Sequence, residues 1–182
     1  MTVNETLLEQ AKAYDPGALS ELYDSYAPQI YAYIYRRVGD AGAAEDLTGD
    51  VFVRMLRAIQ NGRAWQDSFQ GWLYRIAHNL VVDHYRRQPS TPDLELDDTV
   101  LPAPEEDPDK NIDQALARQQ IRQALHLLTP EQQEVLALRF GEGLTTKETA
   151  AIVRRTVGAV EALQRRAIAA LQRIILLDRG TQ

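Results

Sequence analysis

The sequence of 182 residues contains no cysteine and only three histidines. Disulfides and thiolate metal sites are therefore excluded, and the histidines do not fall at a metal-ligand spacing. No apolar run approaches the roughly 20 residues of a membrane span, and the start of the chain has neither the basic region nor the apolar core of a secretion signal. We expect a cytoplasmic protein with no metal ion and no direct membrane insertion.

Sequence motifs of common enzymes are also missing. The chain has no glycine-rich phosphate loop, no nucleophile elbow and no paired histidines. We therefore expect no catalytic residue, no cofactor and no small-molecule substrate. A small helical enzyme is the least favoured hypothesis.

Strand-like alternation is absent too, and apolar residues recur with the helical period through most of the chain. The sequence therefore predicts an all-α fold. Several helices before residue 88 can close one small core, and the period predicts another helix at residues 112–128. Helix-capping signals stand at Thr2, Asp15, Thr129, Thr145 and Thr156.

Residues 88–113 differ from the rest of the chain in composition. This segment holds nine acidic residues, one lysine and five of the eight prolines, which gives it a net charge of −8. Such a composition buries too little apolar surface to offset the entropy lost on ordering. We interpret it as an acidic, flexible, proline-rich linker between two small helical domains, at residues 1–87 and 114–182.

The second predicted domain is basic and contains a helix-turn-helix pattern. Its net charge is +4, against −2 for residues 1–87. Positive charge is typical of a nucleic-acid surface, although a solvated charged face gives the same balance. A short helix opened by Thr145, a tight turn and a longer helix capped by Thr156 indicate a DNA-binding unit, with an ordinary helical hairpin as the alternative.

Two sets of motifs carry a wider resemblance. The first is AEDL at 44–47 with VFVR at 51–54, FQGWLYRIAHN at 69–79 and DHYRR at 83–87, and the second runs from LTPEQ at 128–132 to Arg166 and Ala167. In this order they resemble region 2 and region 4 of the extracytoplasmic-function (ECF) sigma factors. The resemblance implies a subunit that binds core RNA polymerase, recognises two promoter elements and helps to open the DNA.

One predicted helix carries acidic residues beside its apolar stripe. Asp46 and Asp50 are one helical turn apart and share a face. Complementation of the helix dipole explains early acidic residues but explains Asp50 poorly, because it lies beyond the first turn. The resemblance implies that this face binds the clamp helices of the largest polymerase subunits, and that the protein also contacts the polymerase flap. The candidate core-polymerase-binding residues are Glu45, Asp46, Asp50 and Arg54.

The next predicted helix combines cations, an amide and aromatic rings on one stripe. Cations contact phosphates, an amide can hydrogen-bond a base edge, and an aromatic ring can stack on an unpaired base. The resemblance implies that this helix and the loop at 61–68 hold the melted minus-ten strand. We interpret Trp72 as core, whereas Trp65 either stacks on a base or covers the core edge. The candidate minus-ten residues are Arg63, Trp65, Arg75, His78, Asn79, Tyr85, Arg86 and Arg87.

The last helix would read the minus-thirty-five element. Arg154 and Arg155 stand where the family usually has a glycine and an apolar residue, and Glu161 stands where a lysine is common. Either the turn geometry differs, or the two cations are placed towards the DNA backbone. Gln164 could pair with adenine and Arg165 with guanine, but a solvated face has the same composition, so no base is assigned. The candidate minus-thirty-five residues are Arg154, Arg155, Thr156, Ala159, Glu161, Gln164, Arg165 and Arg166.

The main alternative is a stand-alone helix-turn-helix regulator whose N-terminal helical domain senses a signal or dimerises. That hypothesis gives no role to an acidic polymerase-binding face, and it predicts duplex binding without polymerase. The promoter, the inducing signal and an anti-sigma factor as partner are left open by the sequence.

Overall fold

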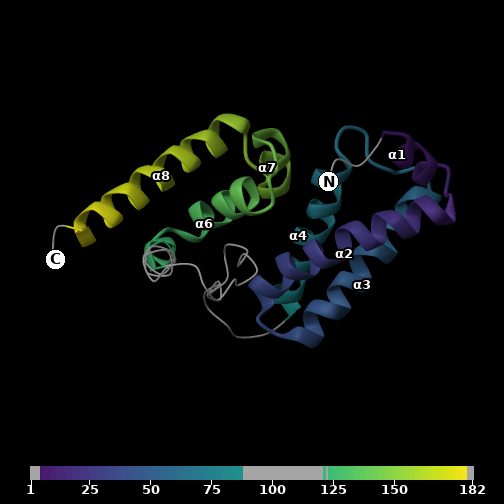
Figure 1. The fold of residues 1–182 in the computed structure, drawn as a ribbon, viewed down its shortest axis with the longest axis horizontal. Helices are drawn as coiled ribbons and strands as arrows, with labels where there is room; N and C mark the ends of the chain where they lie inside the picture. The colour runs from purple at the N-terminus through teal and green to yellow at the C-terminus, as the bar shows by residue number, and fades with distance from the viewer. Residues whose placement is uncertain (1–4, 88–120, 122, 180–182) are drawn as a thin grey trace, which may run out of the picture. The chain divides into compact units, whose positions relative to one another are not determined.

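A computed structural model describes residues 5–87, 121 and 123–179, with side chains up to residue 174. The chain divides into two compact units, unit 1 within Met1–Asp93 and unit 2 within Leu94–Gln182. Every regular element among the described residues is a helix (Figure 1), which confirms the all-α prediction. The predicted linker at 88–113 lies outside the described residues, so the domain boundaries at 87 and 114 stay predictions.

Unit 1 contains α1 (Glu5–Lys12), α2 (Pro16–Val38), α3 (Ala41–Gln60) and α4 (Phe69–Arg87). Helices α2, α3 and α4 pack against one another, and α1 packs against α2. The predicted start at Asp15 is confirmed, because its side chain accepts a hydrogen bond from the Ala18 amide at 2.8 Å. Gly39, at φ 67°, ends α2, and Asp40 then caps α3. The signal at Thr2 lies outside the described residues.

Aromatic rings fill much of the core of unit 1. Tyr33 and Tyr74 are fully buried and meet edge to face, with ring centroids 5.2 Å apart. Tyr26 meets Phe69 in the same manner at 5.1 Å. Edge-to-face pairs add stabilisation beyond the area they bury, and they fix α2 against α4.

Unit 2 contains α6 (Pro130–Leu136), the π-helix η1 (Ala137–Gly141), α7 (Thr146–Val153) and α8 (Val157–Arg179). Capping boxes at Thr129 and Thr145 are both present, as predicted. The hydroxyl of Thr156 accepts from the Ala159 amide at 3.2 Å, which confirms the third cap. Most of the helix predicted at 112–128 lies outside the described residues, although Ile121 and residues 123–126 are helical.

The core of unit 2 is aliphatic. One cluster gathers Leu125, Leu128 and Leu136 around Ala167 of α8. A second cluster gathers Val135, Ala150 and Val160, and so joins α6, α7 and α8. No helix within the described ranges is long and apolar enough to cross a membrane.

Candidate polymerase and nucleic-acid surfaces

The exposed side of α3 carries the four candidate polymerase-binding residues, which we call the α3 face: Glu45, Asp46, Asp50 and Arg54. Because Asp40 caps the helix and α3 begins at Ala41, none of these carboxylates lies in the first turn. Complementation of the helix dipole, which falls off within the first turn, therefore accounts poorly for all three acidic residues. Gly49, on the same side, has open space where a side chain would begin, with no atom of another part of the chain within 4 Å.

Val53 is an apolar residue on this side of α3 that is not among the residues predicted from the sequence. Its side chain is 43% exposed, and it lies three residues after Asp50, on the same side of the helix. Nearby, Tyr23 of α2 is 48% exposed and its ring meets Phe52 edge to face at 4.7 Å. The sequence signal that could have identified Val53 is its apolar side chain at a position outside the apolar stripe of the helix. A partner that contacts the α3 face would meet apolar as well as acidic surface.

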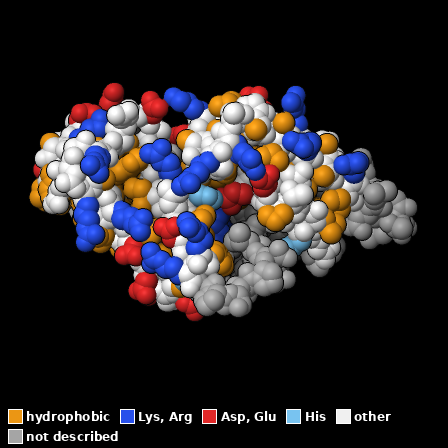
Figure 2. Space-filling model, turned by 180° about the vertical axis from the view of Figure 1, so that it is seen from behind, with side chains coloured by type: hydrophobic (Ala, Val, Ile, Leu, Met, Phe, Trp, Pro, Cys, Tyr) orange, Lys and Arg blue, Asp and Glu red, His pale blue; other side chains and the backbone are white. Residues whose placement is uncertain are grey.

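Cationic side chains line the exposed part of α4. Arg75, Arg86 and Arg87 are exposed, and Asn79 is half-buried between them along the helix. Arg86 lies 4.0 Å from the Asp83 carboxylate, a marginal surface ion pair that a phosphate could replace. Figure 2 shows one face of the molecule, where Lys and Arg side chains lie among apolar and acidic ones.

Two of the candidate minus-ten residues, His78 and Tyr85, form hydrogen bonds with α2. The Nδ1 atom of His78 lies 3.2 Å from the Tyr33 hydroxyl. The Tyr85 hydroxyl donates to the backbone carbonyl of Arg37. His78 and Tyr85 thus join α4 to α2, so the structure gives each of them an internal partner in addition to the predicted DNA.

Arg37 forms the centre of this α2–α4 junction, and no motif in the sequence marks it. Its side chain is 4% exposed, lies over the Tyr33 ring at 3.6 Å from the centroid, and donates to the Tyr33 carbonyl at 2.9 Å. Burial raises the pKa of the Tyr85 hydroxyl above 10.0, and the positive charge of Arg37 partly opposes that shift. The sequence does not distinguish a buried arginine at a helix end from an exposed one, so only the packing reveals the burial of Arg37.

The loop at 61–68 buries its tryptophan. Trp65 is 5% exposed, and its ring meets Phe69 at 4.8 Å and Trp72 at 5.7 Å between centroids. The Lys12 ammonium lies over the same ring at 5.3 Å, so α1 reaches this loop. Of the two alternatives left open for Trp65, this burial favours the one in which the ring covers the core edge. Arg63, by contrast, is exposed.

The turn between α7 and α8 carries backbone strain at Arg154. This residue has φ 55° and ψ 45°, in the left-handed region, and its amide donates to the Ala150 carbonyl as the cap of α7. The turn thus keeps left-handed geometry without a glycine. An L-residue in this conformation costs about 1–2 kcal/mol. The strained residue is exposed, which leaves its cationic side chain at the surface.

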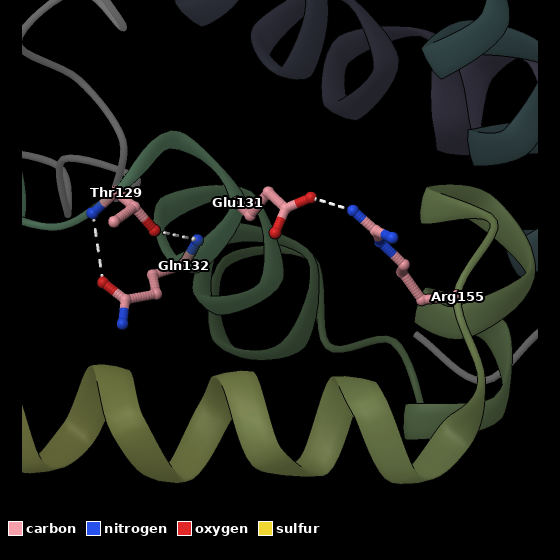
Figure 3. Close-up of polar contacts among 4 residues, drawn as sticks. All are labelled: Thr129, Glu131, Gln132 and Arg155. Atoms are coloured by element: carbon pink, nitrogen blue, oxygen red, sulfur yellow. Dashed lines mark hydrogen bonds and ion pairs between the residues drawn. The ribbon is translucent and has the colours of Figure 1, made fainter.

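Arg155 pairs with an acidic residue of α6. Its guanidinium donates to the carboxylate of Glu131 (Figure 3), and both side chains are about half exposed, at 52% and 57%. Beside it, Thr129 and Gln132 form the capping box that starts α6. The ion pair therefore joins the start of α6 to the turn of the helix-turn-helix.

The candidate residues of α8 divide by exposure. Thr156 caps the helix, Ala159 is half-buried, and the exposed members are Glu161, Arg165 and Arg166. Gln164 is half-buried, and its side-chain carbonyl accepts from Arg139 at 3.3 Å. Arg139 belongs to η1 and also donates to the Leu144 carbonyl. The π-helical turn thereby orients Gln164, one of the predicted base-contacting residues.

Comparison with known proteins matches both units to one family. Residues 22–91 match sigma-70 region 2, and residues 124–173 match sigma-70 region 4. The chain is 38% identical over 173 residues to the ECF RNA polymerase sigma factor BldN of Streptomyces coelicolor, covering 93% of this chain and 64% of the relative. It is 32% identical over 142 residues to the ECF RNA polymerase sigma factor SigE of Mycolicibacterium smegmatis, covering 77% of this chain and 54% of the relative. The chain thus spans less than two thirds of either relative.

Solved structures show a similar fold. CnrH, solved in complex with the cytosolic domain of CnrY, has a TM-score of 0.62 and 24% identity, covering 96% of each chain. The sigma factor RpoE of Bartonella quintana, solved with the anti-sigma factor NepR, has a TM-score of 0.60 and 19% identity, covering 87% of this chain and 97% of that chain.

Proposed function

This chain belongs to the ECF sigma factors of the sigma-70 family, and we propose that it directs core RNA polymerase to specific promoters and starts transcription there. The observation that carries the proposal is the presence of region 2 and region 4, in that order, on two separate helical units. A stand-alone helix-turn-helix regulator accounts for unit 2 only. We assign residues 1–87 to polymerase binding and the minus-ten element, 88–113 to the linker, and 114–182 to the minus-thirty-five element.

The α3 face is the proposed contact for the clamp helices of the largest polymerase subunits. Its carboxylates are exposed and lie beyond the first helical turn, and Val53 adds apolar area beside them. A basic partner helix would gain both charge complementarity and apolar burial. The flap of the same polymerase is a further proposed contact of the protein.

The proposed nucleic-acid contacts come from α4 and from the helix-turn-helix. On α4, the exposed arginines would contact backbone phosphates of the melted minus-ten strand, and Asn79 would contact a base or sugar. On α8, Arg165 and Arg166 are accessible to duplex DNA. An anti-sigma factor is a further proposed partner, because the fold neighbour RpoE was solved with one.

Transcription in vitro tests the proposed function. Genomic DNA fragments are transcribed by purified core RNA polymerase with and without this protein. Initiation at specific promoters, seen only when both are present, is the expected result. Duplex binding without polymerase, together with no specific initiation, would favour the stand-alone regulator instead.

Two variants test the assigned surfaces, each with its own measurement. Asp46→Lys with Asp50→Lys should weaken capture of core polymerase without loss of helicity, because exposed charges contribute little to folding. The matched control is Glu21→Lys with Asp24→Lys, which makes the same charge change on exposed positions of α2.

Asn79→Ala should keep polymerase capture but slow promoter opening, measured as permanganate reactivity of unpaired thymines. A normal bubble would remove Asn79 from the DNA contacts.

A further inference from the structure

Glu131 pairs with an exposed cation in the turn of the helix-turn-helix. It lies in the first turn of α6, outside the helix-turn-helix, and its carboxylate accepts from Arg155 in the turn before α8 (Figure 3). Both side chains are more than half exposed, so neither is locked in place by the core. An exposed ion pair of this kind contributes little to folding, about 0.2–1 kcal/mol at most, so it can exchange partners.

A phosphate competes directly with Glu131 for the same guanidinium. Arginine binds carboxylate and phosphate oxygens with the same N–H donors, so the donor that Arg155 gives to Glu131 is not at the same time given to a phosphate. DNA that approaches the turn must therefore displace Glu131, or approach with a negative charge left beside the phosphate. Either route lowers the affinity of the helix-turn-helix for duplex DNA.

We propose that Glu131 sets the DNA affinity of unit 2 by competing with the DNA backbone for Arg155. The inference rests on the proposed function, because it takes the turn before α8 as a DNA contact. It assigns a role to a residue outside the predicted interface. The partner is identified by its chemistry, as the phosphate backbone of duplex DNA, and no base sequence is required.

Strain in the neighbouring residue supports this assignment. Arg154 occupies the left-handed region, where glycine would fit without strain, and its side chain is exposed. The turn therefore presents two successive arginines at the surface, one of them at a conformational cost. Two cations beside a recognition helix favour a polyanion, and Glu131 neutralises one of them in the unbound protein.

A double-mutant cycle on the full chain separates competition from general repulsion. The four proteins are the natural chain, Glu131→Gln, Arg155→Ala and the double variant. Binding to a fluorescein-labelled duplex of mixed sequence is measured by fluorescence anisotropy at low salt. We expect Glu131→Gln to bind more tightly by up to about fivefold, which is the fold-change equivalent to the upper end of an exposed ion pair. We expect Arg155→Ala to bind more weakly.

The decisive comparison is the effect of Glu131→Gln in the natural chain and in the Arg155→Ala background. If Glu131 acts through Arg155, Glu131→Gln gains little or nothing in the Arg155→Ala background. An equal gain in duplex affinity in both backgrounds would mean that Glu131 merely repels DNA. No gain in either background would mean that Glu131 has no effect on DNA binding. Both results overturn the proposal. Circular dichroism melting of all four proteins confirms that each variant is folded. Because this assay contains no polymerase, a failure of promoter-specific transcription would count against the proposed function and leave the competition result standing.

Discussion

The cores of the two units differ in chemistry. Twelve of the thirteen aromatic residues precede residue 88, and six of those are buried in unit 1. The remaining aromatic residue, Phe140 in unit 2, is 58% exposed, and the buried apolar side chains described in unit 2 are aliphatic. The aromatic core uses directional ring contacts, whereas the aliphatic core depends on shape and on well-capped helices.

The candidate binding residues are also held differently in the two units. In unit 1, His78 and Tyr85 join α4 to α2 through Tyr33 and the buried Arg37. In unit 2, Arg155 pairs with Glu131 at the surface. Substitutions at the α2–α4 junction should therefore affect folding and binding together, whereas substitutions at the exposed pair should affect binding with little effect on folding.

Removal of a buried ring from unit 1 should have the largest effect. Tyr74 is fully buried and meets Tyr33 edge to face, so Tyr74→Ala leaves a cavity and should cost about 3–5 kcal/mol. Both tryptophans lie in unit 1, at positions 65 and 72, so tryptophan fluorescence reports its unfolding. The control is Tyr23→Ala, which changes a ring that is 48% exposed and should cost far less. Similar losses in the two variants would contradict the role given to buried rings.

Removal of a buried leucine from unit 2 should cost somewhat less. Leu138 in η1 is fully buried, and Leu138→Ala should destabilise unit 2 by about 2–5 kcal/mol. Far-ultraviolet circular dichroism follows this loss, and the tryptophan transition of unit 1 should stay in place. Leu127→Ala, at a side chain that is 71% exposed, is the matched control. A shift of the tryptophan transition in Leu138→Ala would mean that the two units unfold together.

Local signals in the sequence predicted helix starts correctly. The caps at Asp15, Thr129, Thr145 and Thr156 depend on residues within one turn of each other, so spacing alone identifies them. The same local signals predicted the order of helix, turn and helix in unit 2. The π-helical turn η1 was not predicted, because no local motif marks it.

Long-range packing limited the prediction of the site. Tyr74 was not selected as a core residue, yet it is fully buried because α4 packs against both α2 and α3 and so buries a wide arc. The partners of Trp65 and Tyr85 include Lys12 and Arg37, which lie more than 45 residues away in the chain. Periodicity within one helix cannot identify such contacts, which explains why Trp65 remained ambiguous.

Loss of the Tyr85 hydroxyl should have a smaller, pH-dependent effect. Tyr85→Phe removes the hydrogen bond to the Arg37 carbonyl and should cost about 0.5–1.5 kcal/mol near neutral pH. Burial raises the pKa of Tyr85 in the folded chain above 10.0, so the stability linked to its neutral form is present below that pH and is lost as the pH rises through the folded pKa. Thermal melting at neutral and alkaline pH should show a shallower alkaline decline in Tyr85→Phe than in the natural chain. Tyr23→Phe, at an exposed ring, should leave the decline unchanged.

The smallest expected effect is a gain in stability at the turn of unit 2. Arg154→Gly relieves left-handed strain of about 1–2 kcal/mol, but glycine also makes the unfolded chain more flexible, by roughly 0.5–1 kcal/mol. The net stabilisation should therefore be about 1 kcal/mol or less, measured by thermal melting followed by circular dichroism. Duplex binding should weaken at the same time, because a cation is lost from the turn.

Arg155→Gly is the matched control for this last prediction. It removes a cation from the adjacent position, which has no left-handed backbone, so it should weaken duplex binding without any gain in stability. If Arg154→Gly stabilises the chain and weakens DNA binding while Arg155→Gly only weakens binding, stability and binding are separable at the surface of unit 2. They are not expected to separate at the buried Arg37 of unit 1, whose side chain packs on Tyr33 beside α4, the helix with the proposed DNA contacts. A loss of stability in Arg154→Gly would show that the arginine makes contacts worth more than its strain, and the contrast between the two units would then fail at this turn.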